Sequence, residues 1–301
     1  MVSPWINAAT YSFLIALTLA LKTGGYLPKD ADRVLSRFMV GITLPAAIVQ
    51  NLNGKTVDPS YFQLILLGIG FNLIPLAISK LSSTHNRIVA DRMAGTSGFN
   101  IGNFAVPFVS GLFSSDAMVI TSVFDIGNSL MCLGLNGMFI AGAGEESIST
   151  SPLDLCKSIV KSVPVMTYLV MLSLCLAGVS FPDQVMVVVE KCAAANPPVA
   201  MAVIGTSVNL PIDKANSDLS SAIQILLIRL LAIAIEIGIL FVVPISQVMR
   251  ETLVVLCLSP IAAMSVVFAD QYGLDKGSIA LANIMSIPLS LLGMAAAISL
   301  M

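Results

Sequence analysis

The sequence has few charges and few of the residues on which most catalytic and metal sites depend. Only 11% of its 301 residues are charged, and it holds a single histidine, His85, which falls in a connecting loop. Its five cysteines lie in or beside apolar segments without a CxxC spacing, which favours packing roles over a disulfide or metal framework. HExxH and GxSxG motifs are absent, so neither an intramembrane zinc protease nor a serine hydrolase is favoured. We expect no enzyme activity, no metal and no cofactor.

Apolar residues are abundant instead. They make up 56% of the chain, and its mean hydropathy is +0.93. Repeated runs of about 20 apolar residues are typical of a polytopic protein in a lipid bilayer. No basic cluster points to a nucleic-acid partner. Because the N-terminus MVSPW lacks the basic region of a signal peptide, we expect the first span to be retained.

Ten apolar runs predict an all-α membrane protein with ten transmembrane helices and no separate soluble domain. The runs are Trp5–Leu21, Leu35–Leu52, Tyr61–Ser79, Val89–Phe113, Ala117–Ala141, Ile159–Val179, Val185–Val208, Leu219–Val243, Thr252–Tyr272 and Ser278–Leu300.

The distribution of lysine and arginine predicts the orientation. With the N-terminus outside, the inner loops carry eleven of these residues and the outer loops carry three, while Arg229 sits within a span. Positive charge accumulates on the cytoplasmic side of membrane proteins. We therefore expect a multi-pass protein of the plasma (inner) membrane with both termini outside.

Prolines recur at half the chain length. Pro45 in span two matches Pro197 in span seven (197 − 45 = 152), and Pro107 in span four matches Pro260 in span nine (260 − 107 = 153). A single intramembrane proline is more often a simple kink, but two at one offset indicate a repeat. Each half has five spans, an odd number, so the second half is predicted to be inverted. Inverted repeats with interrupted helices in matching positions are typical of secondary transporters.

The repeat divides the chain into three parts. We expect a first five-helix repeat over residues 1–143, a cytoplasmic linker over 144–157, and a second, inverted repeat over 158–301.

The stretch GTSGFNIGNFAVPFVSG, residues 95–111, interrupts span four with polar and helix-breaking residues. Proline removes a backbone donor, glycine loosens a helix, and an unpaired amide at membrane depth is costly. Irregular backbone in a bilayer is tolerated only where protein buries it or water reaches it. We interpret the stretch as a discontinuous helix that lines a substrate site and crosses span nine.

The predicted site suits an organic anion. Half-helix N-termini present free N–H groups and positive dipole ends, and amide side chains orient a carboxylate without a full countercharge. Spans four and nine contain no lysine or arginine. The alternative is that the asparagines cap broken ends or bond neighbouring helices. The expected substrate-binding residues are Asn100, Gly102, Asn103, Pro107, Asn196, Ser259 and Pro260.

Charged residues at membrane depth are functional candidates by default. Asp125 in span five, with Asn128 three residues later, is a candidate for proton or cation coupling, or else bonds the broken ends of span four. Arg229 and Glu236 lie seven residues apart in span eight, about 10 Å along a helix. For these two, a structural role or snorkelling is favoured over substrate contact.

Several of these segments resemble the auxin efflux carrier family, which includes plant PIN-type carriers and bacterial permeases. The likeness covers most of the ten spans. It includes FMVGITLPAAIVQNLNGKTVDPSYF around Pro45, the Asn-x6-Pro spacing of Asn100 and Pro107, NPPVAMAVIGTSV, SPIAAMSVVFADQYGLD with Pro260, and ANIMSIPLSLL. The resemblance implies a scaffold domain and a transport domain, with helices four and nine crossing at their prolines. It also implies that Asn100 contacts a substrate carboxylate, that small organic anions are exported or exchanged, and that a homodimer forms through the scaffold.

The sequence also departs from the plant pattern. Pro164 is followed by Val165, where plant carriers have asparagine, and the central loop is short, so auxin itself is not the favoured substrate. Two further readings stay open: a sodium- or proton-coupled organic-anion symporter, and a ligand-binding membrane sensor that does not transport.

Overall fold

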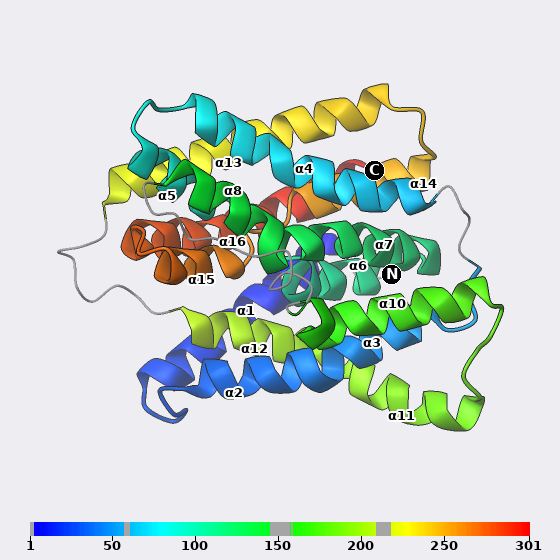
Figure 1. The fold of residues 1–301 in the computed structure, drawn as a ribbon. Helices are drawn as coiled ribbons and strands as arrows, with labels where there is room; N and C mark the ends of the chain where they lie inside the picture. Colours follow the sequence, from blue (N-terminus) through cyan, green and yellow to red (C-terminus); the bar gives the residue numbers. More distant parts are fainter. Residues whose placement is uncertain (1–2, 57–60, 145–156, 158, 209–217) are drawn as a thin grey trace.

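The computed structural model describes residues 3–56, 61–144, 157, 159–208 and 218–301 (Figure 1). Every regular element in these ranges is a helix, which confirms the predicted all-α class. The described residues also contain one isolated antiparallel β-bridge, which pairs Phe99 with Ile261. Of the predicted linker 144–157, residues 145–156 lie outside the described ranges, and so do Cys156 and Lys214.

Among the described residues, seven helical stretches are long and apolar enough to cross a membrane, which indicates a membrane protein. They are α1 (Pro4–Thr23), α2 through α3 (Ala31–Leu52), α4 (Phe62–Leu81), α7 through α8 (Asp116–Ala143), α11 through α12 (Asp183–Ser207), α13 (Leu219–Val242) and α16 (Lys276–Leu300).

Three of these stretches are composite. The first consists of α2 (Ala31–Phe38), the π-helical turn η1 (Met39–Thr43) and α3 (Leu44–Leu52). The second consists of α7 (Ser115–Leu130), η4 (Met131–Leu135) and α8 (Asn136–Ala143), and the third of α11 (Asp183–Ala194) and α12 (Asn196–Ser207).

The other three predicted spans contain shorter helices. Span four holds α5 (Asn86–Thr96), the π-helical turn η3 (Ile101–Ala105) and α6 (Val106–Leu112). Span six holds α10 (Val163–Leu176), and span nine holds α14 (Gln247–Cys257) and α15 (Met264–Gln271).

Polar caps set the starts of several helices, because the first backbone N–H groups of a helix have no partner within it. Asp218 accepts from the Ser220 amide at the start of α13, and Asp275 accepts from the Ser278 amide at the start of α16. At the C-terminal end of α1, Gly25 adopts a φ of 77°, and this left-handed conformation ends the helix.

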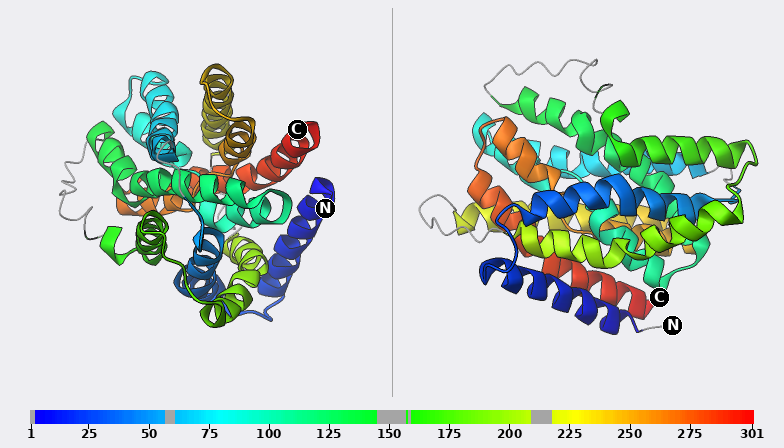
Figure 2. Two further views of the ribbon diagram at one scale, coloured as in Figure 1. Left: turned by 90° about the vertical axis from the view of Figure 1, so that its right-hand side faces the viewer. Right: turned by 90° about the horizontal axis from the view of Figure 1, so that it is seen from below.

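The helices form two layers that cut across the order of the sequence (Figure 1). The α2 layer comprises α1, α2, α3, α10, α11 and α12, with contacts of α1 to α12, α3 to α10 and α3 to α11. The α4 layer comprises α4, α5, α7, α8 and α13–α16, with contacts of α4 to α7, α4 to α13 and α13 to α16. Each layer therefore draws helices from both halves of the chain. Figure 2 shows α1 and α16 side by side, and these two helices join the layers along one edge.

Glycines allow the closest helix contacts in both layers. In the α4 layer, a Cβ added at Gly127 would lie 2.1 Å from the Ile65 carbonyl oxygen, so α4 and α7 touch through their backbones. In the α2 layer, a Cβ added at Gly205 would lie 2.0 Å from Thr18 Oγ1. Small residues at such contacts are typical of membrane helix packing, where close approach supplies the attraction.

Candidate functional site: a crossing of two interrupted segments

Two segments leave the helical conformation near the centre of the molecule and meet there. The first is the stretch between α5 and η3, and the second is the stretch between α14 and α15. They pair as short antiparallel strands: the Asn100 amide donates to the Pro260 carbonyl oxygen (2.9 Å), and the Ala262 amide donates to the Gly98 carbonyl oxygen (3.3 Å). Backbone groups that lost their helical partners thus bond to each other, which non-helical backbone at membrane depth requires.

Gly98 is the position that allows this approach. Its φ is 78°, which residues with a side chain rarely adopt. A Cβ at Gly98 would lie 2.5 Å from Cys132 Sγ and 2.7 Å from Ala262 Cβ. Both the backbone conformation and the lack of space therefore require glycine.

Asn128 on α7 holds the first segment in place. Its Nδ2 donates to the Phe99 carbonyl oxygen (2.9 Å), and its Oδ1 accepts from the Phe99 amide (3.0 Å), as a neighbouring strand would. Asn72 on α4 also donates to Asn128 Oδ1 (3.2 Å). Asn128 is buried. The sequence leaves two roles open for the Asp125–Asn128 pair: ion coupling, or hydrogen bonding to the broken ends of span four. For Asn128, this geometry is that of the second role.

Asn283 and Ser286 on α16 hold the second segment in a similar way. Asn283 Nδ2 donates to the carbonyl oxygens of Ile261 (3.0 Å) and Ala262 (3.2 Å), while Ser286 Oγ accepts from the Ile261 amide (3.2 Å). Asn283 and Ser286 are not among the site residues predicted from the sequence. The available signal was a pair of polar residues three positions apart inside an apolar helix, the same spacing as Asp125 and Asn128.

Asp125 connects the crossing with the other layer. Its Oδ1 accepts from Asn128 Nδ2 (2.9 Å), and its Oδ2 accepts from the hydroxyl of Tyr168 on α10 (2.9 Å). Tyr168 is fully buried and belongs to the α2 layer, whereas Asp125 belongs to the α4 layer. A chain of hydrogen bonds therefore runs from the crossing to the contact between the layers.

The predicted substrate residues of span four lie at and beyond the crossing. Asn100 has a non-helical conformation directly before η3, without a side-chain capping hydrogen bond. Gly102 and Asn103 follow within η3, and all three residues are partly buried. A Cβ at Gly102 would lie 3.0 Å from a methyl carbon of Leu44, so this turn approaches the α2 layer. The capping role that was the alternative for Asn100 is not observed.

The position of Pro107 corrects the sequence interpretation. Pro107 occupies the first turn of α6, where a missing N–H costs little, and the interruption lies earlier, between Thr96 and Ile101. Its carbonyl oxygen accepts from the Tyr11 hydroxyl (2.9 Å). Only one of the two predicted prolines, Pro260, therefore lies at the crossing itself. The preceding residue, Ser259, is buried and donates to the Leu256 carbonyl oxygen (2.5 Å).

The other predicted prolines mark a second meeting point, in the α2 layer. Pro45 is the second residue of α3, which follows η1 directly, and Pro197 lies at the start of α12. Next to them, the hydroxyl of Thr43 donates to Asn196 Oδ1 (2.9 Å), and both residues are buried. Asn196 therefore lies in the α2 layer and not among the residues of the crossing.

Arg229 reaches the crossing from α13. It is 2% exposed, its guanidinium carbon lies 4.1 Å from the centre of the Phe99 ring, and its Nη1 is 3.5 Å from the Thr96 carbonyl oxygen. A buried guanidinium in this position does not snorkel toward the membrane surface, so that part of the sequence expectation is wrong. Glu236 is fully buried as well.

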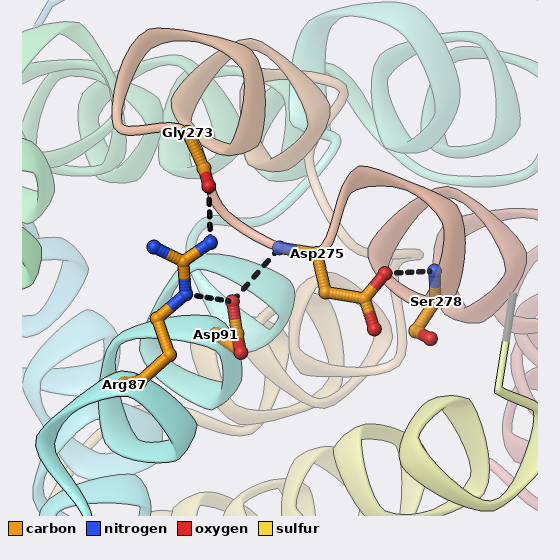
Figure 3. Close-up of polar contacts among 5 residues, drawn as sticks. All are labelled: Arg87, Asp91, Gly273, Asp275 and Ser278. Carbon is orange, nitrogen blue, oxygen red and sulfur yellow. Dashed lines mark hydrogen bonds and ion pairs between the residues drawn. The ribbon is translucent and has the colours of Figure 1, made fainter. Parts of the chain in front are cut away.

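The helix before the first segment, α5, is also joined to the loop that follows α15 (Figure 3). Asp91 on α5 accepts from the Asp275 amide (2.9 Å), in the loop between α15 and α16, and Arg87 donates to the Gly273 carbonyl oxygen. Asp275 in turn accepts from the Ser278 amide (3.1 Å). These contacts fix α5 against the end of α15, so the crossing is braced at one end as well as at its centre.

At the crossing itself, the arrangement offers amide donors, ends of half-helices and one nearby guanidinium. Such a set can orient an anionic group. Comparison of the chain with known protein families and with curated proteins finds no match.

Proposed function

We propose that this protein is a secondary transporter that exports or exchanges small organic anions, with carboxylates as the substrate class. The observation that carries the proposal is the crossing, where two interrupted segments pair through Asn100 and Pro260. Interrupted helices cost backbone hydrogen bonds, and in membrane proteins they occur where the irregular backbone serves a binding site or pathway. Asn100 and Asn103, both partly buried beside this backbone, are the residues proposed to contact the carboxylate.

The helix ends at the crossing support an anionic substrate. η3 continues into α6, so that helical residues run from Ile101 to Leu112, and α15 begins at Met264 just after the second segment. The N-terminal end of each carries partial positive charge. Carboxylates are stabilised at such ends without a lysine or arginine in the same segment.

We further propose that the chain consists of ten spans in two inverted five-helix repeats. Helices α5 and α14 support this: each spans 11 residues, and both their starts (247 − 86 = 161) and their ends (257 − 96 = 161) are separated by 161 positions. This spacing aligns Pro260 with Phe99 rather than with Pro107, since 260 − 161 = 99. The repeat is therefore argued from the helices and not from the prolines of spans four and nine.

Contacts between helices support the repeat in a second way. The contact of α1 with α12 has its counterpart in the contact of α10 with α3, and the contact of α4 with α7 has its counterpart in that of α13 with α16. Thr43 and Asn196, which share a hydrogen bond, are 153 positions apart, close to the 152 that separates Pro45 from Pro197. Contacts between matched positions are expected where a pseudo-twofold axis passes.

In this proposal the α2 layer is the scaffold and the α4 layer, which carries the crossing, slides against it in an elevator-type cycle. Membership of the auxin efflux carrier family, placement in the plasma (inner) membrane with both termini outside, and a homodimer through the α2 layer belong to the same proposal. They rest on the resemblance and on the distribution of lysine and arginine described above.

Coupling to an ion gradient is the second candidate, and Asp125 is the observation that favours it. One of its oxygens bonds to the asparagine that holds the crossing, and the other bonds across the layers to Tyr168. A proton on this carboxylate would remove its negative charge and so weaken the hydrogen bonds that Asn128 and Tyr168 donate to it. Between the two coupling ions considered, this geometry favours a proton over sodium, because two of the carboxylate's acceptor sites already have protein partners.

Counterflow in proteoliposomes tests the proposal. Labelled malonate, malate and indole-3-acetate are offered to the protein, to Asn100→Ala and to the control Asn86→Ala, which alters an exposed asparagine at the start of α5. A hydrogen bond to a charged group contributes about 1.5–3 kcal/mol, so we expect Asn100→Ala to lower uptake of a dicarboxylate roughly 10- to 100-fold and the control to leave it unchanged. Binding without counterflow from folded protein would favour the sensor instead.

A further inference from the structure

Arg229 has N–H groups that do not donate to any other group at the crossing. The side chain is 2% exposed, and its Nε and Nη2 have no hydrogen-bond partner among the described residues. Its third nitrogen reaches the Thr96 carbonyl oxygen only at 3.5 Å. Buried guanidinium N–H groups are costly when they are left unpaired, so this arrangement calls for a partner that side chains and backbone do not provide.

A small cavity adjoins these nitrogens. Its volume is about 40 Å³, and it lies between α13, the second crossing segment and α16. The polar residues that line it are Arg229, Ser259, Ser286 and Ser290. A space of roughly 10–15 Å³ on this measure holds one water, so the cavity admits a monatomic ion or a group of two to three heavy atoms. It does not admit a whole dicarboxylate.

The donors and charges around the cavity favour an anion over water alone. Ser259 and Ser286 donate their hydroxyl protons to backbone carbonyls, which leaves the guanidinium as the main source of free donors. The acidic residue on the same helix, Glu236, is seven positions away, or about 10 Å along the axis. The buried carboxylate of Glu236 offsets part of the charge of Arg229, but its oxygens make no hydrogen bond to the guanidinium. A compact anion accepts the free N–H groups through charge-assisted hydrogen bonds, which are stronger than those to water.

We propose that Arg229, together with Ser290 and the second crossing segment, binds one compact monovalent anion. The site is separate from Asn100 and Asn103, and its occupant is either a halide or a carboxylate group no larger than formate. Because the bound ion would sit against Ser259 and Ile261 of the second segment, it would stabilise the paired segments. The proposal concerns equilibrium binding and stands whether or not the protein transports.

Thermal unfolding of the purified full-length protein in neutral detergent provides the test. Potassium gluconate is replaced stepwise by potassium chloride or potassium formate at constant ionic strength. A ligand that binds only the folded state raises the midpoint in a saturable way, and we expect a rise of about 2–4 °C. A rise with chloride alone assigns an inorganic ion, and a rise with formate assigns a carboxylate group.

Three variants make the result specific. Arg229→Gln removes the charge, and Ser290→Leu fills the cavity while leaving the arginine in place, so both are expected to lose the anion-dependent rise. The second variant keeps the test valid if the first does not fold. The control Arg250→Gln should retain the rise, because Arg250 already donates to the Leu240 carbonyl oxygen (3.0 Å). An equal rise in all variants, or none in the unaltered protein, would overturn the proposal and leave a water-filled cavity.

Discussion

The hydroxyl of Tyr168 donates to the carboxylate of Asp125 across the boundary between the two layers, over 2.9 Å and out of contact with solvent. Sliding of one layer past the other would have to break this bond. It is also the last link in a chain that begins at the Phe99 backbone and passes through Asn128. The state of the crossing and the contact between the layers are therefore expected to depend on each other.

Replacing Tyr168 by phenylalanine tests the energetic value of this bond. The variant leaves one buried carboxylate oxygen of Asp125 without its donor, which is expected to lower the free energy of unfolding by about 1–3 kcal/mol. The measurement is thermal or denaturant unfolding in detergent. Tyr26→Phe is the matched control because Tyr26 is 83% exposed, and it should change stability by less than about 0.5 kcal/mol. Equal stability of the two variants would mean that the bond is not formed in solution.

Asp125→Asn tests coupling. Asparagine keeps an oxygen that accepts from Tyr168 but does not take up a proton near neutral pH. If Asp125 carries the coupling proton, the variant should retain counterflow of the labelled anion and lose the acceleration that an imposed pH gradient produces. Asp116→Asn, at the exposed start of the same helix, should keep the response to the gradient. A variant that still responds to the gradient would assign Asp125 a structural role only.

Gly98→Ala should prevent the crossing from forming. A left-handed conformation costs an alanine about 1–2 kcal/mol, and here the added Cβ also overlaps Cys132 and Ala262. Gly25→Ala separates the two effects, since Gly25 has a φ of 77° with no neighbouring atom within 4 Å. We expect folded protein with slightly lower stability from Gly25→Ala and little folded protein from Gly98→Ala, measured by monodispersity and midpoint of unfolding. Adding Cys132→Ala and Ala262→Gly should recover part of the loss.

The brace between α5 and the loop before α16 can be compared with an exposed ion pair between the two helices that flank this loop. Asp91, whose side chain is 21% exposed, accepts from the Asp275 amide, and Asp91→Ala is expected to cost about 1–3 kcal/mol. Asp270 pairs with Lys276 at 2.6 Å, but its side chain is 70% exposed, so Asp270→Ala should cost between 0 and about 1 kcal/mol. The unfolding midpoints of the two variants measure this difference, and the midpoint of Asp91→Ala should be the lower one. The reverse order would contradict the role given to the brace.

The start of α13 should fray in acid. The hydroxyl of Ser221 and then the amide of Ser220 hold the pKa of the Asp218 carboxyl below its ordinary value. Because the folded-state pKa is lowered, the cap contributes fully above the ordinary value of about 3.8 and is lost as the pH falls through the lowered one. Hydrogen exchange of the first-turn amides, compared between the protein and Asp218→Asn from pH 5 to pH 2.5, measures this. The difference should disappear at the acidic end, and a constant difference would contradict it.

Much of the fold follows from the sequence because lipid imposes long apolar helices. The predicted span Leu219–Val243 coincides with α13 within one residue, and Ser278–Leu300 lies within α16. The stretch around Asn100 was selected because amides and glycine at membrane depth need an explanation, and the structure places them at the crossing.

The rest depended on contacts that a single sequence does not reveal. The sequence predicts an interruption at Pro107 because proline breaks helices. In the structure, Pro107 lies in the first turn of α6, and the helix is interrupted near Gly98 instead. Asn283 and Tyr168 act through partners more than 20 positions away along the chain, on helices whose neighbours the apolar pattern does not specify. For the same reason, Arg229 could not be placed against Phe99.

The bond from the Asn100 amide to the Pro260 carbonyl has a consequence for synthesis. The first segment enters the membrane with the first half of the chain, while its partner lies 160 residues further on (260 − 100 = 160). At about 5–20 residues per second, the ribosome needs roughly 8–32 s to deliver that partner. During this interval the peptide groups beside Asn100 must stay hydrated or be shielded by the insertion machinery, because the bilayer offers them nothing to bond.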